Sequence, residues 1–234
     1  MFKGLIEDAR AISNRDPAAR SLFEVILLYP GFHSVVLHRI AHWFYNKNMF
    51  FIARLISQVN RFFTGIEIHP GAKIGKGLFI DHGMGIVIGE TAEVGDNCTI
   101  YHNVTLGGTG KDKGKRHPTI GENVLIGAGA KILGPFKVGD NAKIGANAFV
   151  SQEVEANTTV VGIPARPVRK GSEKIASIEL DHVNIPDPVA QEICRLLVRL
   201  ERLEKIVEEE HGEGLDERLK NMPHEEFQEM DYNI

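Results

Sequence analysis

Aliphatic residues recur at every sixth position through the middle of the chain, in three runs separated by two breaks. The runs are Ile68, Ile74 and Ile80; Ile88, Val94, Ile100 and Leu106; and Ile120, Ile126, Ile132, Val138, Ile144 and Val150. Neither an α-helix nor an alternating β-strand has a period of six. A repeat of this kind predicts a solenoid, in which each unit covers its apolar side chain by stacking on its neighbours.

A glycine follows many of these aliphatic residues, as in Ile74-Gly75, Val94-Gly95 and Ile126-Gly127. Glycine has no Cβ and accepts turn geometry that other residues resist. A six-residue unit therefore suits one short strand and one turn, and three units close a triangular coil. This hexapeptide pattern predicts a left-handed parallel β-helix over residues 65–170.

The two breaks in the repeat are candidate functional segments. Two residues are inserted between Ile80 and Ile88, around Asp81-His82-Gly83-Met84-Gly85. A longer loop, residues 107–118, separates Leu106 from Ile120. Loops that leave a rigid scaffold commonly carry function.

Helical patterns precede the repeat. In residues 1–64, apolar residues stand at helical spacing through 22–26 and 52–59. Asp16-Pro17 predicts a helix start, with the acid at the cap and proline in the first turn, and Pro30-Gly31 predicts the end of that helix. We therefore predict an α+β chain in which an N-terminal helical domain, 1–64, precedes the β-helix.

The C-terminal region, 171–234, is predicted to hold a helix and a tail. Pro186-Asp187-Pro188 opens a segment whose apolar residues alternate steps of four and three, the pattern of a coiled-coil seam. They are Val189, Ile193, Leu196, Leu200, Leu203 and Val207. Such a helix could pair with copies of itself or pack on the β-helix. The tail beyond Glu210 is acidic, and we expect it to be mobile.

Composition excludes several classes of function. No apolar stretch approaches the roughly 20 residues that cross a bilayer, and the acidic start lacks the pattern of a secretory signal, so we expect a cytoplasmic protein with no membrane partner. A net charge of −4 and a pI near 6.2 give no basic field for nucleic acid. Cys98 and Cys194 stand far apart without a metal-binding spacing, so we expect two free thiols.

Seven segments of the chain together resemble the serine acetyltransferases. They are residues 14–20 (NRDPAAR), 31–33 (GFH), 38–43 (HRIAHW), 65–75 (GIEIHPGAKIG), 80–83 (IDHG), 104–111 (VTLGGTGK) and 116–118 (RHP). The hexapeptide repeat alone indicates only the wider acyltransferase superfamily. The RDPA segment, the DHG turn and the GGTGK loop narrow the resemblance to this family.

The resemblance implies transfer of an acetyl group from acetyl-CoA to the hydroxyl of L-serine, the first step of cysteine biosynthesis. In the family, β-helical prisms associate as trimers and acetyl-CoA lies in the groove between adjacent prisms, so each site would be shared by two subunits. The matched motifs hold no nucleophilic Cys or Ser, which predicts direct transfer in a ternary complex. We expect no metal.

Two side chains carry the catalysis that the resemblance implies. A serine hydroxyl is a poor nucleophile at neutral pH, so a base must take its proton as the new bond forms. His82, in the inserted turn, stands at the family position of the base, and Glu67 stands at the position of its carboxylate partner. Many relatives carry Asp at the second position, so the longer side chain of Glu67 changes its reach.

A zwitterionic acceptor calls for carboxylates near its ammonium group and cations near its carboxylate. By resemblance, Asp16 and Asp81 bind the ammonium group. Arg116 and His117 bind the carboxylate. Each position also has a purely structural interpretation: a helix cap for Asp16, a turn residue for Asp81, and a solvated basic loop for the two cations.

Four further residues lie near acetyl-CoA by resemblance. Gly108 and Ala128 offer backbone groups to the pantetheine arm. Ala146 and Arg166, the latter in the turn 163–166, lie near the nucleotide end.

The same resemblance implies two regulatory partners. Family members often end in Ile, whose carboxylate enters the active site of O-acetylserine sulfhydrylase, and this chain ends in Ile234. A tail without a partner is the alternative. L-cysteine inhibits the family and should compete with serine. The short N-terminal region leaves open a homotrimer or a dimer of trimers.

Three other functions fit parts of the pattern. γ-type carbonic anhydrases hold zinc on three histidines of the same scaffold, but they use a His pair five residues apart, and Glu122 stands five residues after His117. A related acetyltransferase with a sugar or another acceptor is the second, and a non-catalytic assembly protein is the third. The paired acids with Arg116-His117 favour an amino acid as acceptor.

Overall fold

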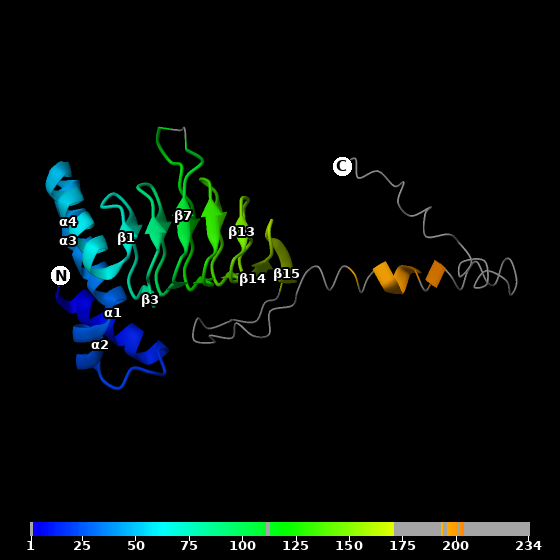
Figure 1. Cartoon of the computed structure of the whole chain (residues 1–234), viewed down its shortest axis with the longest axis horizontal. Helices are drawn as coiled ribbons and strands as arrows, with labels where there is room; N and C mark the ends of the chain where they lie inside the picture. Colours follow the sequence, from blue (N-terminus) through cyan, green and yellow to red (C-terminus); the bar gives the residue numbers. More distant parts are fainter. Residues whose placement is uncertain (1, 111–112, 171–192, 194–195, 201, 204–234) are drawn as a thin grey trace, which may run out of the picture. The chain divides into compact units, whose positions relative to one another are not determined.

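The computed structural model describes residues 2–110, 113–170, 193, 196–200 and 202–203. The chain divides into two compact units, residues 1–188 and residues 189–234, and each is described by itself. In the first unit, helices gather at one end of a solenoid of short strands (Figure 1).

Four helices precede the strands: α1 (Phe2–Arg15), α2 (Leu22–Leu28), α3 (Pro30–Asn46) and α4 (Phe50–Thr64). The predicted helix start at Asp16-Pro17 is wrong. Asp16 follows the last turn of α1, and its backbone N–H donates to Ile12 O at 2.9 Å. Helix α2 begins instead after Ser21, whose hydroxyl accepts the N–H of Glu24. It ends before Pro30, as predicted, and Pro30 then opens α3.

The strands form three sheets that the chain visits in turn, one on each side of a triangular prism. The five-stranded sheet holds β1 (Glu67–Ile68), β4 (Val87–Ile88), β7 (Thr105–Gly107), β10 (Lys131–Leu133) and β13 (Phe149–Val150). The four-stranded sheet holds β2 (Lys73–Ile74), β5 (Glu93–Val94), β8 (Thr119–Ile120) and β11 (Lys137–Val138). The six-stranded sheet holds β3 (Phe79–Asp81), β6 (Thr99–Tyr101), β9 (Leu125–Ile126), β12 (Lys143–Ile144), β14 (Thr158–Val161) and the antiparallel β15 (Arg166–Lys170). The parallel pairing confirms the predicted β-helix.

The aliphatic residues of the six-residue repeat point into this prism and form its core. All of them are buried except Ile74, which is partly buried. A second inward position, two residues earlier in each unit, escaped the sequence analysis because small residues often fill it. Its members are Ile66, Ala72, Leu78, Ile86, Ala92, Cys98, Val104, Val124, Ala130, Ala142 and Ala148.

The glycines after the aliphatic residues serve a purpose other than the predicted one. At Gly95 an added Cβ would lie 2.5 Å from Gly121 O in the next coil, so glycine is required by the close approach of stacked backbones. The left-handed turns fall elsewhere, largely on asparagines such as Asn97, Asn123 and Asn141, with φ between 55° and 59°. Asparagine tolerates this conformation better than most residues.

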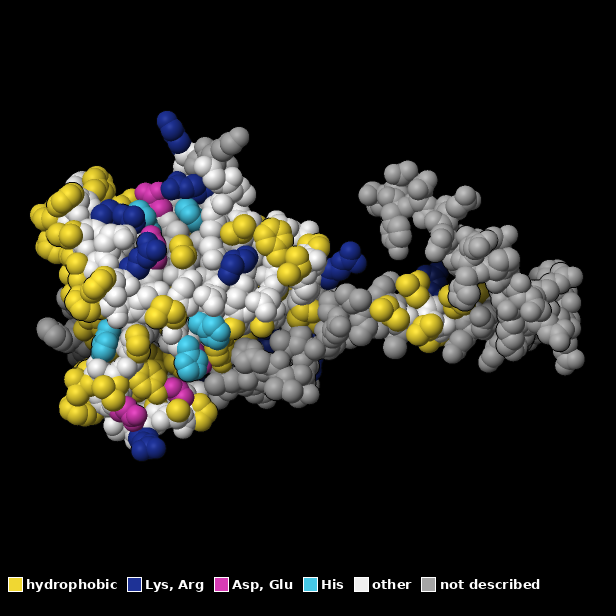
Figure 2. All heavy atoms as spheres, viewed as in Figure 1, with side chains coloured by type: hydrophobic (Ala, Val, Ile, Leu, Met, Phe, Trp, Pro, Cys, Tyr) yellow, Lys and Arg dark blue, Asp and Glu magenta, His cyan; other side chains and the backbone are white. Residues whose placement is uncertain are grey.

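Helix α4 buries its small and polar face and exposes its large apolar one. Ala53, Ser57, Asn60 and Thr64 are buried, and Ser57 Oγ donates to Ile68 O at 2.8 Å. The exposed side chains include Phe51, Leu55, Val59, Phe62 and Phe63. Hydrophobic side chains accordingly cover the helical end of the molecule (Figure 2).

The predicted C-terminal helix lies mostly outside the described residues. Of its seam, Ile193, Leu196, Leu200 and Leu203 are described, and their side chains are exposed within this chain. Val189, Val207, Cys194 and the tail that ends in Ile234 lie outside. No helix in the described part of the chain combines the length and the apolar character that crossing a membrane requires.

Candidate active site

A buried arginine fixes the end of α1 against the prism. Arg15 donates to Asn97 O at 3.0 Å, Cys98 O at 3.1 Å and Thr99 Oγ1 at 3.2 Å, and it also donates to Gly77 O. Burial lowers its pKa to about 10, so the guanidinium stays charged at neutral pH. The next residue in the chain, Asp16, is thereby held beside the coil that carries β3.

Asp16 lies in a cavity of about 370 Å³ together with Tyr29, Asp81 and His82. Its Oδ2 accepts the Tyr29 hydroxyl at 2.6 Å, and its Oδ1 accepts the Ala18 N–H at 2.8 Å. Burial raises the pKa of Asp81, and the charge of Asp16 raises it further. The structure therefore brings three of the predicted site residues together, from a loop and from the first break in the repeat.

His82 occupies a conformation that few side chains adopt. Its φ is 56°, inside a tight turn in which Gly83 N–H donates to Asp81 O at 2.7 Å. Non-glycine residues in this region are enriched at functional sites. The imidazole is 77% exposed, and its Nε2 lies 3.6 Å from Asp81 Oδ1. Its ring also meets the ring of His102 edge to face, with 6.2 Å between centroids.

Glu67 is engaged elsewhere in this chain. It opens β1, and its Oε2 lies 3.0 Å from Arg61 Nη1 on α4. The carboxylate beside the His82 ring is therefore that of Asp81.

His82 stands at the head of one edge of the prism, where the six-stranded sheet turns into the five-stranded sheet. We name the turns at residues 82–86, 102–104, 127–130 and 145–148 the His82 edge. Stacked coils are linked there by hydrogen bonds from Gly129 N to His102 O at 2.9 Å and from Asn147 N to Ala128 O at 2.8 Å. Ala128 and Ala146, predicted to contact acetyl-CoA, thus lie on the same edge as the predicted base. Arg166 opens β15 beyond it.

Arg116 and His117 lie on another edge, where the five-stranded sheet turns into the four-stranded one. We name its turns, residues 69–72, 89–92, 108–110 and 113–118, the Arg116 edge; the loop after β7 projects from it (Figure 1). Thr91 Oγ1 accepts the backbone N–H groups of Arg116 at 3.0 Å and His117 at 3.1 Å. Gly108, predicted to contact acetyl-CoA, also lies here.

The side chains of this edge are connected by charge and by hydrogen bonds. The Arg116 guanidinium pairs with Glu90, whose Oε1 accepts the Tyr45 hydroxyl at 3.1 Å. Thr91 Oγ1 lies 2.8 Å from His117 Nδ1, and burial lowers the pKa of this histidine. One chain therefore does not bring the four predicted serine-binding residues together: two lie at each edge, on opposite sides of the five-stranded sheet.

Comparison with known proteins identifies the family. A model of the bacterial transferase hexapeptide, six repeats, matches residues 117–152. A serine acetyltransferase of Staphylococcus epidermidis is 57% identical over 202 residues, 86% of this chain and 94% of that protein. One of Synechococcus elongatus is 54% identical over 208 residues, 89% of this chain and 84% of that protein. The chain belongs to the serine acetyltransferase family.

Solved structures of serine acetyltransferases share the fold. The Neisseria gonorrhoeae enzyme in complex with serine is 44% identical, with a TM-score of 0.70 over 72% of this chain and 69% of that chain. A serine acetyltransferase in complex with cysteine is 42% identical, with a TM-score of 0.72 over 73% of this chain and 66% of that chain. The predictions of family, fold and acyltransferase activity are confirmed.

Sequence reasoning missed several residues that lie beside the predicted site residues of this serine acetyltransferase. Tyr29 borders the cavity that holds Asp16, and His102 repeats the position of His82 one coil further along. Tyr45, Glu90 and Thr91 support the cations of the Arg116 edge. For His102 the available signal was the period itself, because residues one coil apart stack on the same edge.

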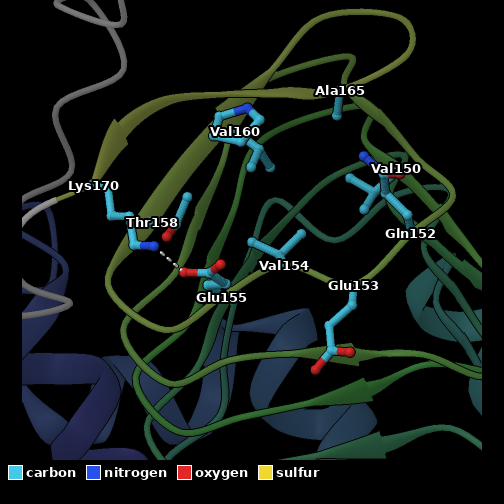
Figure 3. Close-up of a pocket in the computed structure, with 10 residues that line it drawn as sticks. Val150, Gln152, Glu153, Val154, Glu155, Thr158, Val160, Ala165 and Lys170 are labelled. Carbon is cyan, nitrogen blue, oxygen red and sulfur yellow. Dashed lines mark ion pairs between the residues drawn. The ribbon is translucent and has the colours of Figure 1, made fainter.

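A further cavity, of about 170 Å³, lies at the last coil of this serine acetyltransferase (Figure 3). Val150, Val154 and Val160 line it, and Lys170 pairs with Glu155 at its border. It contains none of the predicted site residues. Within the described ranges, no three His, Cys, Asp or Glu side chains are placed to hold a metal ion.

Proposed function

We propose that this serine acetyltransferase moves the acetyl group of acetyl-CoA to the hydroxyl of L-serine, giving O-acetylserine and CoA in the first step of cysteine biosynthesis. The observation that carries the proposal is the cavity in which Asp16, Asp81 and His82 face one space. Relatives at 54–57% identity bear this family's name, and a solved relative at 44% identity binds serine.

In the proposed reaction, His82 is the general base. Its imidazole takes the hydroxyl proton while the serine oxygen attacks the thioester carbon. The tetrahedral intermediate then expels the CoA sulfur, which receives that proton from the imidazolium. No acetyl-enzyme forms, so the order of events is a ternary complex followed by direct transfer.

Glu67 is the proposed partner of His82, stabilising its imidazolium form. In the free chain Glu67 is bound to Arg61, so the dyad requires it to exchange this cation for the imidazole. Asp81 already lies near the His82 ring, and it is the competing carboxylate.

Asp16 and Asp81 are proposed to bind the ammonium group of serine. The charge of Asp16 raises the pKa of Asp81 because the two carboxylates repel each other. An ammonium group placed between them would relieve this repulsion. The Tyr29 hydroxyl keeps Asp16 turned into the cavity. Arg116 and His117 are proposed to bind the serine carboxylate.

The separation of these groups supports a homotrimer, or a pair of trimers, in which the His82 edge of one chain meets the Arg116 edge of the next. Acetyl-CoA would lie along the groove, against Ala128, Ala146 and Arg166 of one chain and Gly108 of its neighbour. An elongated cofactor suits such an edge, because successive coils place equivalent backbone groups along its length.

The proposal extends to two further ligands. L-cysteine differs from L-serine in one atom, and it should compete for the same cavity; a relative at 42% identity binds cysteine. The terminal carboxylate of Ile234 is proposed to enter the active site of O-acetylserine sulfhydrylase. Deleting Ile234 should abolish that affinity without changing turnover.

Turnover of acetyl-CoA with L-serine tests the proposal, with homoserine and sugars as alternative acceptors. His82→Asn should lower kcat by about 10³-fold, because general-base catalysis contributes roughly 10²–10⁴-fold. Its KM for acetyl-CoA should change little. Unchanged turnover in this variant, or a preference for a sugar, would contradict the proposal.

A further inference from the structure

Arg116 has an elaborate support on its own chain. Its guanidinium pairs with Glu90 Oε2, and the other oxygen of Glu90 accepts the Tyr45 hydroxyl at 3.1 Å. Glu90 and Thr91 form the turn between β4 and β5, whereas Tyr45 comes from α3. Three elements far apart in the sequence thus converge on one cation.

Tyr45 is itself held in place. Its ring meets the ring of Phe50 edge to face at 5.0 Å and that of His69 at 5.9 Å. An added Cβ on Gly71 would lie 3.0 Å from Tyr45 Cζ, so the backbone of the prism also touches the ring. The hydroxyl can therefore fix the orientation of the Glu90 carboxylate.

The arginine would be poorly ordered without this support. Its long side chain loses up to roughly 2 kcal/mol of rotamer entropy when it is held in one conformation. A carboxylate on one side of the guanidinium orders it before the ligand arrives, and the planar fork keeps further N–H donors for a second carboxylate. The pair is only partly exposed, with 28% of the Arg116 and 33% of the Glu90 side chain open to solvent.

We propose that Glu90, oriented by Tyr45, is a positioning residue that holds Arg116 ready for the carboxylate of L-serine. This inference rests on the proposed role of Arg116 in binding that carboxylate. Glu90 does not touch the reacting atoms, so its loss should weaken recognition of the acceptor and leave the acetyl-transfer step intact.

Glu93 provides a matched control. It lies three residues further along and borders, with Glu90 and Tyr45, a cavity of about 360 Å³. Its carboxylate pairs with Lys73 at 3.0 Å and lies 3.8 Å from Lys115 Nζ. Its side chain is 39% exposed, close to the value for Glu90. Glu93→Gln removes the same charge from the same surface and leaves Glu90 and Tyr45 in place.

The test measures steady-state kinetics of the full chain with L-serine and with L-serinamide, which lacks the carboxylate. Glu90→Gln should raise KM for L-serine about tenfold, with kcat and the KM for acetyl-CoA within a factor of two. Its KM for L-serinamide should stay at the wild-type value. Tyr45→Phe should raise KM for L-serine about threefold, and Glu93→Gln should leave it unchanged.

Several results would overturn the inference. If Glu90→Gln raises KM for L-serine and for L-serinamide equally, the variant has a general structural defect. Tyr45→Phe, which retains the ring, then decides between such a defect and a positioning role for Glu90. If Tyr45→Phe also affects both acceptors equally, or leaves both unchanged, the inference is wrong.

Arg116→Ala separates this inference from the proposed function. If it raises KM for L-serine while Glu90→Gln does not, Arg116 binds the carboxylate without this support. If Arg116→Ala leaves KM for L-serine unchanged, the proposed role of Arg116 fails, and the positioning role fails with it. Additive effects in the Glu90→Gln, Arg116→Ala double variant would also count against the coupling.

Discussion

The His82 edge and the Arg116 edge hold their side chains in different ways. At the His82 edge the backbone does most of the positioning, because His82 sits at φ 56° in a two-residue insertion. Asp16, which borders the same cavity, is held by the buried contacts that Arg15 makes with the neighbouring edge of the prism, at Gly77, Asn97 and Cys98. At the Arg116 edge the positioning comes from side chains, through Glu90, Tyr45 and Thr91.

This difference fits the roles that we propose for the two edges. A general base must be placed within hydrogen-bonding reach of one proton, and a rigid turn serves that purpose. A carboxylate-binding cation on a long loop needs only its final side-chain atoms ordered. The first edge should therefore be sensitive to loss of buried anchors, and the second to small changes around its side chains.

The largest effect should come from removing Arg15, the buried anchor that holds Asp16 beside His82. Arg15→Met removes the side-chain donor from the carbonyls of Gly77 and Asn97, whereas Cys98 O keeps the Phe79 N–H, and this loss should lower the free energy of unfolding by about 3 kcal/mol. Thermal unfolding measures this loss. Arg116→Lys, at the other edge, should leave the melting temperature unchanged; equal melting temperatures for Arg15→Met and wild type would break the comparison.

A smaller effect should come from crowding the Arg116 edge. An added Cβ on Gly89 would lie 2.0 Å from the His117 ring, so Gly89→Ala must displace that ring. KM for L-serine should rise about tenfold, with kcat within a factor of three, because the base on the opposite edge is untouched. Gly4→Ala, where nothing lies within 4 Å of the added Cβ, is the control. A fall in kcat with unchanged KM would argue against separate edges.

The smallest effect should appear as a pH dependence of serine binding. Burial raises the pKa of Asp81, and its ionised form is the one that we propose binds the ammonium group of serine. As pH falls, Asp81 takes up a proton at a pH above the ordinary value of about 4, and the dissociation constant of L-serine should rise a few-fold. Calorimetric titration between pH 4 and pH 7 measures this. The Asp81→Asn variant should bind L-serine more weakly at neutral pH, and its dissociation constant should no longer depend on pH in this range. If the pH dependence persists in this variant, another group causes it.

The prism could be predicted from the sequence in detail, whereas the site could be predicted only in part. A period of six fixes which side chains point inward, because stacking forces equivalent positions together. The same stacking explains why glycine follows the aliphatic residues, although the sequence analysis assigned those glycines to turns. The helices gave weaker signals: Asp16 looked like a cap, and its position depends on distant contacts of Arg15 that no local pattern contains.

The supports of Arg116 were missed for a similar reason. Tyr45 lies on α3 and Glu90 in a turn of the prism, and only the folded chain brings them to one cation. The sequence also could not predict that Arg116 and His117 lie at a different edge of the prism from Asp16 and Asp81. The repeat does not indicate the edge from which a loop projects.

The central claim is that each active site combines the His82 edge of one chain with the Arg116 edge of another, and complementation between inactive chains tests it most directly. When His82→Ala and Arg116→Ala chains are refolded or expressed together, mixed oligomers contain sites with both edges intact. Turnover at low serine should recover to about a quarter of wild type for random mixing, although each variant alone is nearly inactive. His82→Ala mixed with Asp16→Ala, both on one edge, should recover nothing. If the first mixture stays as inactive as its components, the shared site is contradicted.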